Sequence, residues 1–257
     1  LSGLNQVYGV RVDEDYPKYI YLDDAVKDAQ LHKALYRFFK GDNVLITSKT
    51  NDGEKIIIHT SSDRNPGAFY LFNTKTMKTK HIFDANPLIK ANDMAATEPF
   101  RIKTKDGLML NGYLTLPKGK DKNLPTVVLP HGGPHLRDYW GYNPQVQMLA
   151  NAGYAVVQIN FRGSTGYGDN FEVAGYGNWG TKIQDDIILA TNYAVQQGIS
   201  DKNRMCIFGA SFGGYSALQS AIKEPDLFKC TIGYVGVYDL PMLYNEGDIK
   251  TRKWGDA

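Results

Sequence analysis

The sequence predicts a protein of the α/β class, with a parallel sheet in the second part of the chain and short strands in the first. Two observations lead to this prediction. From about residue 126 onward, apolar runs typical of buried strands alternate with amphipathic stretches typical of helices, which indicates a parallel sheet. In the first ninety-odd residues, short strand-like runs are separated by turn residues instead.

The strand-like runs of the first part end at turn signals such as Asn-Asp-Gly and Asn-Pro-Gly. They cover residues 8–12, 18–22, 44–48, 55–60, 68–73 and 81–83. One helical pattern interrupts them at residues 24–39, where apolar side chains recur at helical spacing. Residues 86–98 are expected to form the linker to the second part.

The second part begins with an apolar run at residues 126–130, which is followed by His-Gly-Gly-Pro at residues 131–134. This is the type of loop that supplies an oxyanion-hole donor in esterases and peptidases. Tetrahedral acyl transfer needs two donors aimed at one oxygen, and the backbone N–H groups of Gly133 and Phe212 are the candidates. The side chain of His131 is either a further donor or only a brace for the loop.

The alternation of helices and strands then continues. Residues 145–151 and 182–197 are expected helices, and residues 154–160 and 231–237 are expected strands. A glycine-rich loop at residues 161–168 lacks the glycine order of a dinucleotide fingerprint and the lysine of a phosphate loop, so it is expected near the active face without binding a nucleotide. Asp185 and Asp186 are expected on a solvated helix face or in a buried structural contact.

Residues 209–213 read Gly-Ala-Ser-Phe-Gly, which is a Gly-x-Ser-x-Gly pattern. An apolar run at residues 204–208 precedes it and a helix-like stretch at residues 214–222 follows it. In this context the pattern forms a nucleophile elbow, because glycines allow close backbone packing and the serine hydroxyl points out near a helix N-terminus. The sequence therefore predicts Ser211 as a nucleophile. The alternative is a glycine-rich turn between a buried strand and a helix.

The order of these motifs resembles the prolyl oligopeptidase family of serine peptidases, in its acylaminoacyl-peptidase and dipeptidyl-peptidase-like branch. The resemblance is carried by residues 106–108, 114–117, 131–134, 160–168 and 209–215. It implies an α/β-hydrolase catalytic domain that is capped by an N-terminal β-propeller, which restricts entry to short peptides. On this basis residues 1–96 are the C-terminal part of a β-propeller plus linker, about two blades, and residues 97–257 are the N-terminal portion of a truncated α/β-hydrolase catalytic domain.

A hydrolase triad runs Ser, then Asp or Glu, then His along the chain, and this sequence has no histidine after Ser211. In the resembled family, the acid and the base lie beyond the point where this sequence stops. Neither Asp239 nor Asp248 is therefore assigned as the acid, and the chain is expected to be a fragment of a larger peptidase. The resemblance also implies that Tyr238 lines the substrate pocket; the alternative is a core tyrosine.

Composition and charge argue against several other classes. A net charge of +2 without a basic run gives no reason to expect nucleic acid, and no apolar run reaches transmembrane length, so no membrane partner is expected. No cofactor or metal is expected, because Gly-Gly-Pro between His131 and His135 forbids the helix that a zinc pair needs. Cys206 and Cys230 are expected as inert thiols in buried strands rather than as a disulfide. The compartment is left open between cytoplasm and periplasm.

The sequence thus predicts a serine peptidase that cleaves short peptides through an acyl-enzyme on Ser211, with the isolated chain inactive because two triad members lie outside it. A carboxylesterase or lipase would share the elbow and the oxyanion loop, but such enzymes usually carry a helical lid in place of propeller-like strands. A non-catalytic interaction fragment is the third alternative. Besides short peptides, the expected partners are a second copy of the chain or the C-terminal part of the enzyme.

Overall fold

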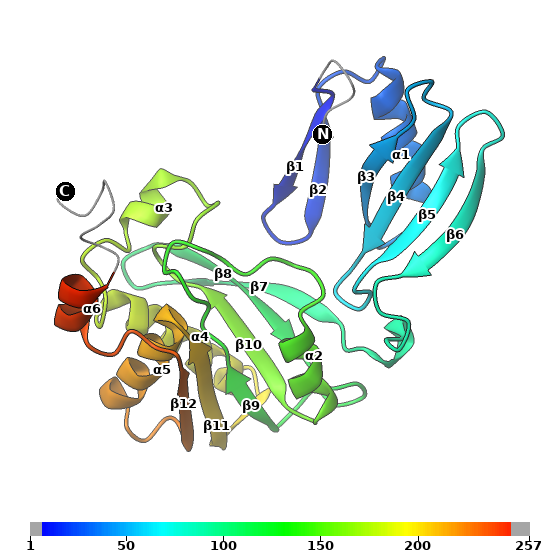
Figure 1. The fold of residues 1–257 in the computed structure, drawn as a ribbon. Coiled ribbons are helices and arrows are strands. Elements are labelled where there is room, and N and C mark those ends of the chain that lie inside the picture. The colour runs from blue at the N-terminus through cyan, green and yellow to red at the C-terminus, as the bar shows by residue number, and fades with distance from the viewer. Residues whose placement is uncertain (1–6, 248–257) are drawn as a thin grey trace. The chain divides into compact units, whose positions relative to one another are not determined.

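The computed structural model describes residues 7–247 and is drawn in Figure 1. The chain divides into two compact units. The first unit holds the chain up to Pro99 together with Thr115–Lys120 and Tyr139–Gly153, and the second holds Phe100–Leu114, Asp121–Asp138 and the chain from Tyr154 onward. Asp248, which the sequence leaves without a role, lies outside the described residues.

Antiparallel strands build the first unit, and they fall where the sequence predicts strands. β1 (Gly9–Asp13) pairs with β2 (Pro17–Tyr21), and a separate meander pairs β3 (Asn43–Lys49), β4 (Lys55–Ser61), β5 (Ala68–Asn73) and β6 (Lys78–Asp84) in sequence order. The helices of this unit are the predicted α1 (Lys27–Phe38), a 3₁₀ turn η1 (Ala91–Asp93) and α2 (Pro144–Asn151). A four-stranded antiparallel meander is the build of one propeller blade.

The meander owes its core to the period-two alternation of β4. Ile56 and Ile58 point to the buried face, while Ile57 between them is less buried. They pack with Val44 of β3, Phe72 of β5 and Leu35 of α1, so the helix covers one face of this sheet. The predicted helical interruption is therefore part of the core of the blade.

The second unit is organised around a six-stranded sheet with the strand order β12-β11-β9-β10-β8-β7. Its strands are β7 (Thr97–Lys103), β8 (Met109–Thr115), β9 (Leu124–Val128), β10 (Ala155–Asn160), β11 (Ser200–Ala210) and β12 (Cys230–Tyr234). β9 pairs in parallel with β10 and β11, and β11 pairs in parallel with β12. The carboxyl ends of these four strands therefore meet at one edge of the sheet, where α/β proteins bind their ligands.

Helices complete this α/β unit. α4 (Lys182–Gln196) connects β10 to β11, and α5 (Phe212–Lys223) connects β11 to β12 (Figure 1). Every residue of β10 is buried, which is typical of a parallel strand that is covered on both faces. The sequence did not predict the two short helices α3 (Asp169–Val173) and α6 (Leu240–Glu246).

The expectation of two buried free thiols is wrong. Cys206 and Cys230 form a disulfide, and no other cysteine is present. The two residues lie opposite each other on the neighbouring strands β11 and β12, with Cα atoms 4.6 Å apart, which a disulfide can span. Cys230 is also exposed rather than buried, because β12 is the last strand of the described sheet.

A further difference concerns the linker. The expected linker at residues 86–98 contains η1, and its last two residues already belong to β7.

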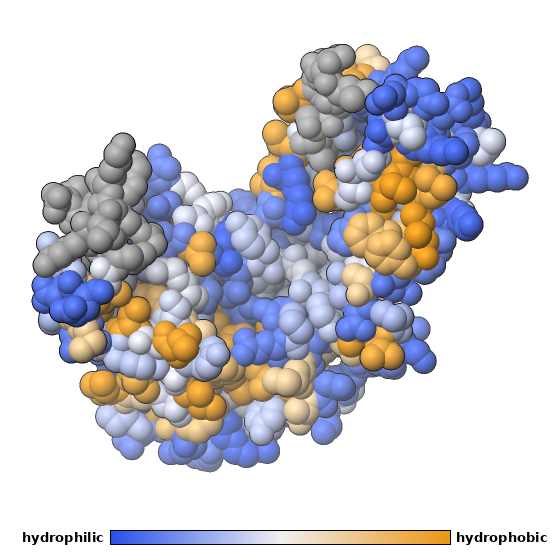
Figure 2. All heavy atoms as spheres, viewed as in Figure 1, coloured by the Kyte–Doolittle hydropathy of each residue, from blue (hydrophilic) through white to orange (hydrophobic). Residues whose placement is uncertain are grey.

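Apolar side chains reach the surface in scattered groups on the face that Figure 2 shows. The exposed ones on or after β12 include Ile232, Val235 and Met242. Across residues 7–247, no helix is both long enough and apolar enough to cross a membrane.

Candidate active site

Ser211 occupies the turn between the end of β11 at Ala210 and the start of α5 at Phe212. Its backbone has φ 56° and ψ −124°, a region that residues other than glycine rarely adopt. The turn is held at both ends, because the Ser211 N–H donates to the Tyr234 carbonyl at 3.0 Å and the Tyr215 N–H donates to the Ser211 carbonyl at 3.1 Å. The side chain is exposed, and Oγ makes no hydrogen bond to any residue between 7 and 247. This is the geometry of a nucleophile elbow.

The two glycines of the pattern are required by close backbone contacts. A Cβ atom on Gly213 would collide with the carbonyl oxygen of Pro130, which lies two residues after the end of the neighbouring β9. A Cβ atom on Gly209 would collide with the backbone of Gly213 itself. The glycines therefore let α5 begin directly against β9 and β11, which positions Ser211 at the carboxyl edge of the sheet.

The loop after β9 lies beside the nucleophile. The position that a Cβ atom would take on Gly132 is 3.6 Å from Cβ of Ser211. The N–H of the next residue, Gly133, has no acceptor among residues 7–247, and the same holds for the N–H of Phe212, the first residue of α5. Two unpaired backbone donors thus flank Ser211, and one of them belongs to a helix N-terminus, which favours negative charge. An arrangement of this kind can stabilise a developing oxyanion.

Both ring nitrogens of His131 are occupied within the protein. Nδ1 lies 2.8 Å from the carbonyl oxygen of Gly132, and Nε2 lies 2.8 Å from Oγ of Ser164. Burial lowers the pKa of His131 to about 4, so the ring is neutral at pH 7 and has one N–H. A carbonyl oxygen only accepts, so the contact with Gly132 places that proton on Nδ1. The single hydroxyl proton of Ser164 then lies between two acceptors, Nε2 of His131 at 2.8 Å and the Phe161 carbonyl oxygen at 2.7 Å. Of the two sequence-based alternatives, the geometry favours the brace, since the neutral ring has no donor left for an oxyanion.

Among residues 7–247, no histidine side chain hydrogen-bonds to Ser211. All five histidines of the sequence precede residue 136, and only His131 and His135 belong to the second unit. His135 uses Nδ1 in a 2.9 Å hydrogen bond to the carbonyl oxygen of Gly163 and packs against the ring of Tyr176. Within the same residues, no group of three or more His, Cys, Asp or Glu side chains is placed to hold a metal ion.

Tyr238 follows β12 at the carboxyl edge of the sheet. It is 48% exposed, so it is not a core residue. Its ring lies against the backbone of Gly233 and Gly236, where a Cβ atom on either glycine would collide with it. The two glycines therefore let the Tyr238 ring pack against the end of β12, and about half of the side chain stays exposed to contact a ligand.

The sequence did not identify a buried ion-pair cluster that supports the glycine-rich loop. Arg162 is 4% exposed and binds Asp186, which is 1% exposed, through Nε at 2.8 Å and Nη2 at 2.9 Å. Its Nη1 also donates to Asp106 at 2.9 Å, and the guanidinium holds the pKa of that carboxyl far below its usual range. Asp186 thus makes the buried structural contact that was one of its two expected roles, whereas Asp185 lies on the surface and pairs with Lys223.

Asp138 lies in the segment that follows residues 131–136, and its carboxyl group is the second one buried near this site. Asp138 receives a hydrogen bond from the side chain of Gln158 on β10, and its backbone exchanges two hydrogen bonds with the side chain of Asn160. Oδ2 of Asp138 is buried without a hydrogen-bond partner among the described residues. Burial consequently raises the pKa of Asp138 to about 7.

Asp138→Asn is expected to make the protein more stable at pH 8 but not at pH 4. The folded pKa of Asp138 is about 7 and the unfolded value is about 3.9, so the stabilising proton is bound below pH 4 and is lost as the pH rises through 7. The amide keeps the neutral form at every pH, and the gain at pH 8 is about 4 kcal/mol at most, at roughly 1.4 kcal/mol per pKa unit. The measurement is thermal unfolding from pH 4 to pH 8, with Asp185→Asn as the exposed control. Equal pH profiles for the two variants would contradict the assignment.

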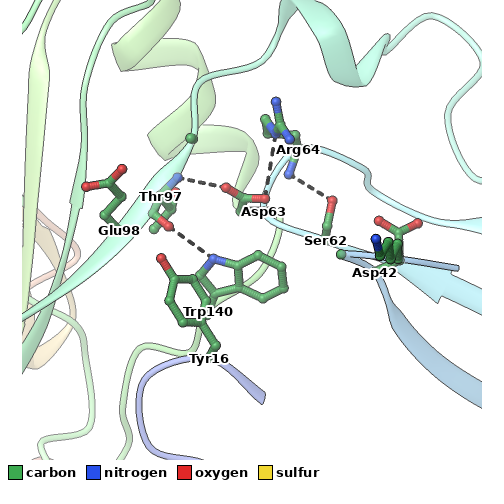
Figure 3. Close-up of a pocket in the computed structure, with 11 residues that line it drawn as sticks. Tyr16, Asp42, Ser62, Asp63, Arg64, Thr97, Glu98 and Trp140 are labelled. Atoms are coloured by element: carbon green, nitrogen blue, oxygen red, sulfur yellow. Dashed lines mark hydrogen bonds and ion pairs between the residues drawn. The ribbon is translucent and has the colours of Figure 1, made fainter. Parts of the chain in front are cut away.

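The first unit contains a separate cavity of about 240 Å³, drawn in Figure 3. The rings of Tyr16 and Trp140 meet edge to face at its wall, with centroids 5.6 Å apart. The buried Asp63 accepts the Thr97 N–H at 2.7 Å, and Trp140 donates to the Thr97 carbonyl at 3.1 Å. Burial raises the pKa of Asp63. These polar groups bind one another, so the hydrogen bonds across the cavity serve to hold its wall together.

The chain is similar to known peptidases over much of its length. Residues 140–257 match the model of the prolyl oligopeptidase family. Dipeptidyl aminopeptidase BIII of Pseudoxanthomonas mexicana is 36% identical over 246 residues, which cover 93% of this chain and 35% of that protein. The acylamino-acid-releasing enzyme of Arabidopsis thaliana is 30% identical over 140 residues, which cover 50% of this chain and 18% of that protein.

Solved structures of other proteins share the fold of this chain. The acylaminoacyl peptidase of Pyrococcus horikoshii, in its orthorhombic crystal form, superposes with a TM-score of 0.67 at 27% identity, over 84% of this chain and 36% of that one. A puromycin hydrolase structure at 22% identity shares the fold, with a TM-score of 0.66. The chain spans 35%, 30% and 37% of the first three curated relatives.

Proposed function

We propose that this chain is part of a serine peptidase of the prolyl oligopeptidase family, whose model its residues 140–257 match, and that Ser211 attacks the scissile carbonyl of short peptides and forms an acyl-enzyme. The observation that carries the proposal is the elbow, where Ser211 has a positive φ and an exposed, unpartnered Oγ. In the proposed first step, Oγ bonds to the carbonyl carbon as its proton passes to a base, and the amine then leaves with that proton.

The oxyanion that forms in this step is proposed to bind the N–H groups of Gly133 and Phe212. Both are unpaired, and the loop that carries Gly133 lies beside Ser211. The loss of one such donor costs roughly 3–4 kcal/mol of transition-state stabilisation in comparable sites. His131 is proposed to support this loop, and Tyr238 is proposed to contact the substrate, since its ring is half exposed at the same edge of the sheet.

We assign the domains on the same basis. Residues 1–96 are proposed to be the C-terminal part of a β-propeller plus linker, which the antiparallel meander β3–β6 supports. Residues 97–257 are proposed to be the N-terminal portion of the catalytic domain. The strand order of the sheet and the helices α4 and α5 between its parallel strands support this assignment.

The isolated chain is expected to be inactive as a peptidase. A serine hydroxyl is a poor nucleophile at neutral pH unless a positioned base takes its proton. His131 and His135 both have other partners, so the base is proposed to come from outside this chain. Oxyanion stabilisation and binding alone would leave roughly a thousandfold acceleration over water, which a routine assay misses.

The test compares residues 1–257 with the full-length protein in the turnover of peptide p-nitroanilides and simple esters, and in labelling by a fluorophosphonate probe. Turnover is expected from the full-length protein only. Steady turnover by residues 1–257 that is abolished by Ser211→Ala would show that the chain contains its own base. His135→Ala then identifies the only histidine of this unit, apart from His131, that is available for the role. A full-length protein that cleaves esters but no peptides would favour the carboxylesterase alternative.

A further inference from the structure

The proposed donor at Gly133 belongs to a peptide unit whose other end is held in place. The unit comprises the carbonyl of Gly132 and the N–H of Gly133, and this peptide bond is trans. In a planar trans peptide, the C=O and the N–H point in opposite directions. Because Nδ1 of His131 binds the Gly132 carbonyl at 2.8 Å, the imidazole determines which way the Gly133 N–H points.

Ser164 in turn fixes the imidazole. Its Oγ lies 2.8 Å from Nε2 of His131, on the side of the ring away from Gly132. The side chain of Ser164 is fully buried, and the ring of Phe161 stacks on the imidazole with centroids 4.2 Å apart and planes 15° apart. The stacked ring restricts rotation of the imidazole about its Cβ–Cγ bond, and the contact with Ser164 holds Nε2 on the side away from Gly132.

Ser164 itself sits on an anchored loop. Arg162, two residues earlier, is tied to Asp186 by side-chain and backbone hydrogen bonds. The loop also meets the oxyanion loop at two further points. The Gly163 carbonyl accepts from His135 at 2.9 Å, and the Thr165 N–H donates to the Leu136 carbonyl at 3.1 Å. The glycine-rich loop, which the Arg162–Asp186 pair anchors, therefore holds residues 131–136 in place through these hydrogen bonds.

We propose that Ser164 is a positioning residue for the oxyanion hole. It acts through His131 to direct the Gly133 N–H toward the carbonyl oxygen of a substrate that is bound beside the Ser211 hydroxyl. The inference rests on the proposed function, because it assigns the direction of a donor whose role is proposed above. It also gives the glycine-rich loop a role in catalysis, although the loop contributes no group to the reacting atoms.

The test measures kcat and KM for a peptide p-nitroanilide in the full-length protein. Ser164→Ala removes the hydroxyl and is expected to lower kcat about ten- to hundredfold with KM unchanged, because the affected donor acts only in the transition state. Ser164→Thr keeps the hydroxyl and is expected to restore most of the lost kcat. Ser164→Cys is nearly isosteric but donates weakly, so it is expected to resemble Ser164→Ala and covers the case in which the alanine variant does not fold.

The matched control is Ser220→Ala. Ser220 is also fully buried in this unit, but its Oγ has no hydrogen-bond partner among residues 7–247. A second readout is inhibition by a peptide trifluoromethyl ketone, whose tetrahedral adduct needs the oxyanion donors, against inhibition by a product peptide, which does not. Ser164→Ala is expected to weaken only the first.

Three outcomes are distinguishable. Unchanged kcat in Ser164→Ala and Ser164→Cys, with Ser211→Ala inactive, would overturn the inference and leave the proposed function intact. Equal losses in the Ser164 variants and in Ser220→Ala, with KM and kcat moving together, would show a merely structural role and would also overturn it. Activity in Ser211→Ala would reject the proposed function itself.

Discussion

Ser211→Ala is expected to lower kcat/KM of the full-length protein for a peptide p-nitroanilide by roughly four to six orders of magnitude, because no other group can form the acyl-enzyme. Labelling by a fluorophosphonate is expected to vanish with it. The elbow gives a further expectation. At φ 56° a glycine is unstrained, so Ser211→Gly should lose the same activity and gain about 1 kcal/mol in the free energy of unfolding.

The control for these variants is Ser220→Ala, which removes a buried hydroxyl from the same helix without touching the elbow. It is expected to retain activity and labelling. Near-normal turnover by Ser211→Ala would show that the nucleophile lies elsewhere. A loss of stability in Ser211→Gly would show that the serine side chain, and not its backbone geometry, holds the turn together.

Arg162→Met is expected to have the largest effect on stability, about 3–5 kcal/mol, because it removes the guanidinium that pairs with the buried carboxyl of Asp186, a residue that is 1% exposed. The double variant Arg162→Met with Asp186→Leu removes both charges and is expected to recover most of this loss. The measurement is urea-induced unfolding, followed by tryptophan fluorescence, at pH 7.

Arg204→Met is the matched control, since Arg204 pairs with Asp201 at 2.7 Å on the surface. The loss of an exposed pair costs about 1 kcal/mol or less. Equal losses in Arg162→Met and Arg204→Met would mean that the buried cluster does not anchor the glycine-rich loop. In that case the anchoring inferred for Ser164 would also be absent.

Local sequence patterns predicted the parts of the fold and site that depend on neighbouring residues. The strand before Ser211, the helix after it and the loop at residues 131–134 each follow from a run of apolar residues and the glycines beside it. The short strand-like runs between turn residues likewise predicted the strands of the first unit. These features need only the spacing of side chains along one element.

Features that join distant segments could not be predicted in this way. The Cys206–Cys230 disulfide depends on the register between two parallel strands, which neither strand specifies alone. Asp186 meets Arg162 across 24 residues, and a surface aspartate on a helix has the same local pattern. The role of His131 depends on which groups face its two nitrogens, and one of them, Ser164, is 33 residues away.

The contact between Gly213 and the backbone of Pro130 also limits which amino acids the positions around Ser211 can accept. Any other amino acid at position 209 or 213 adds a Cβ atom that collides with main-chain atoms, and the main chain cannot move aside as the end of a flexible side chain can. At position 212 the proposed donor is a backbone N–H, which every amino acid except proline supplies, so only the burial of the side chain limits the choice there. Sequence freedom is therefore smallest at two residues that perform no chemistry, and larger at a residue that is proposed to take part in it.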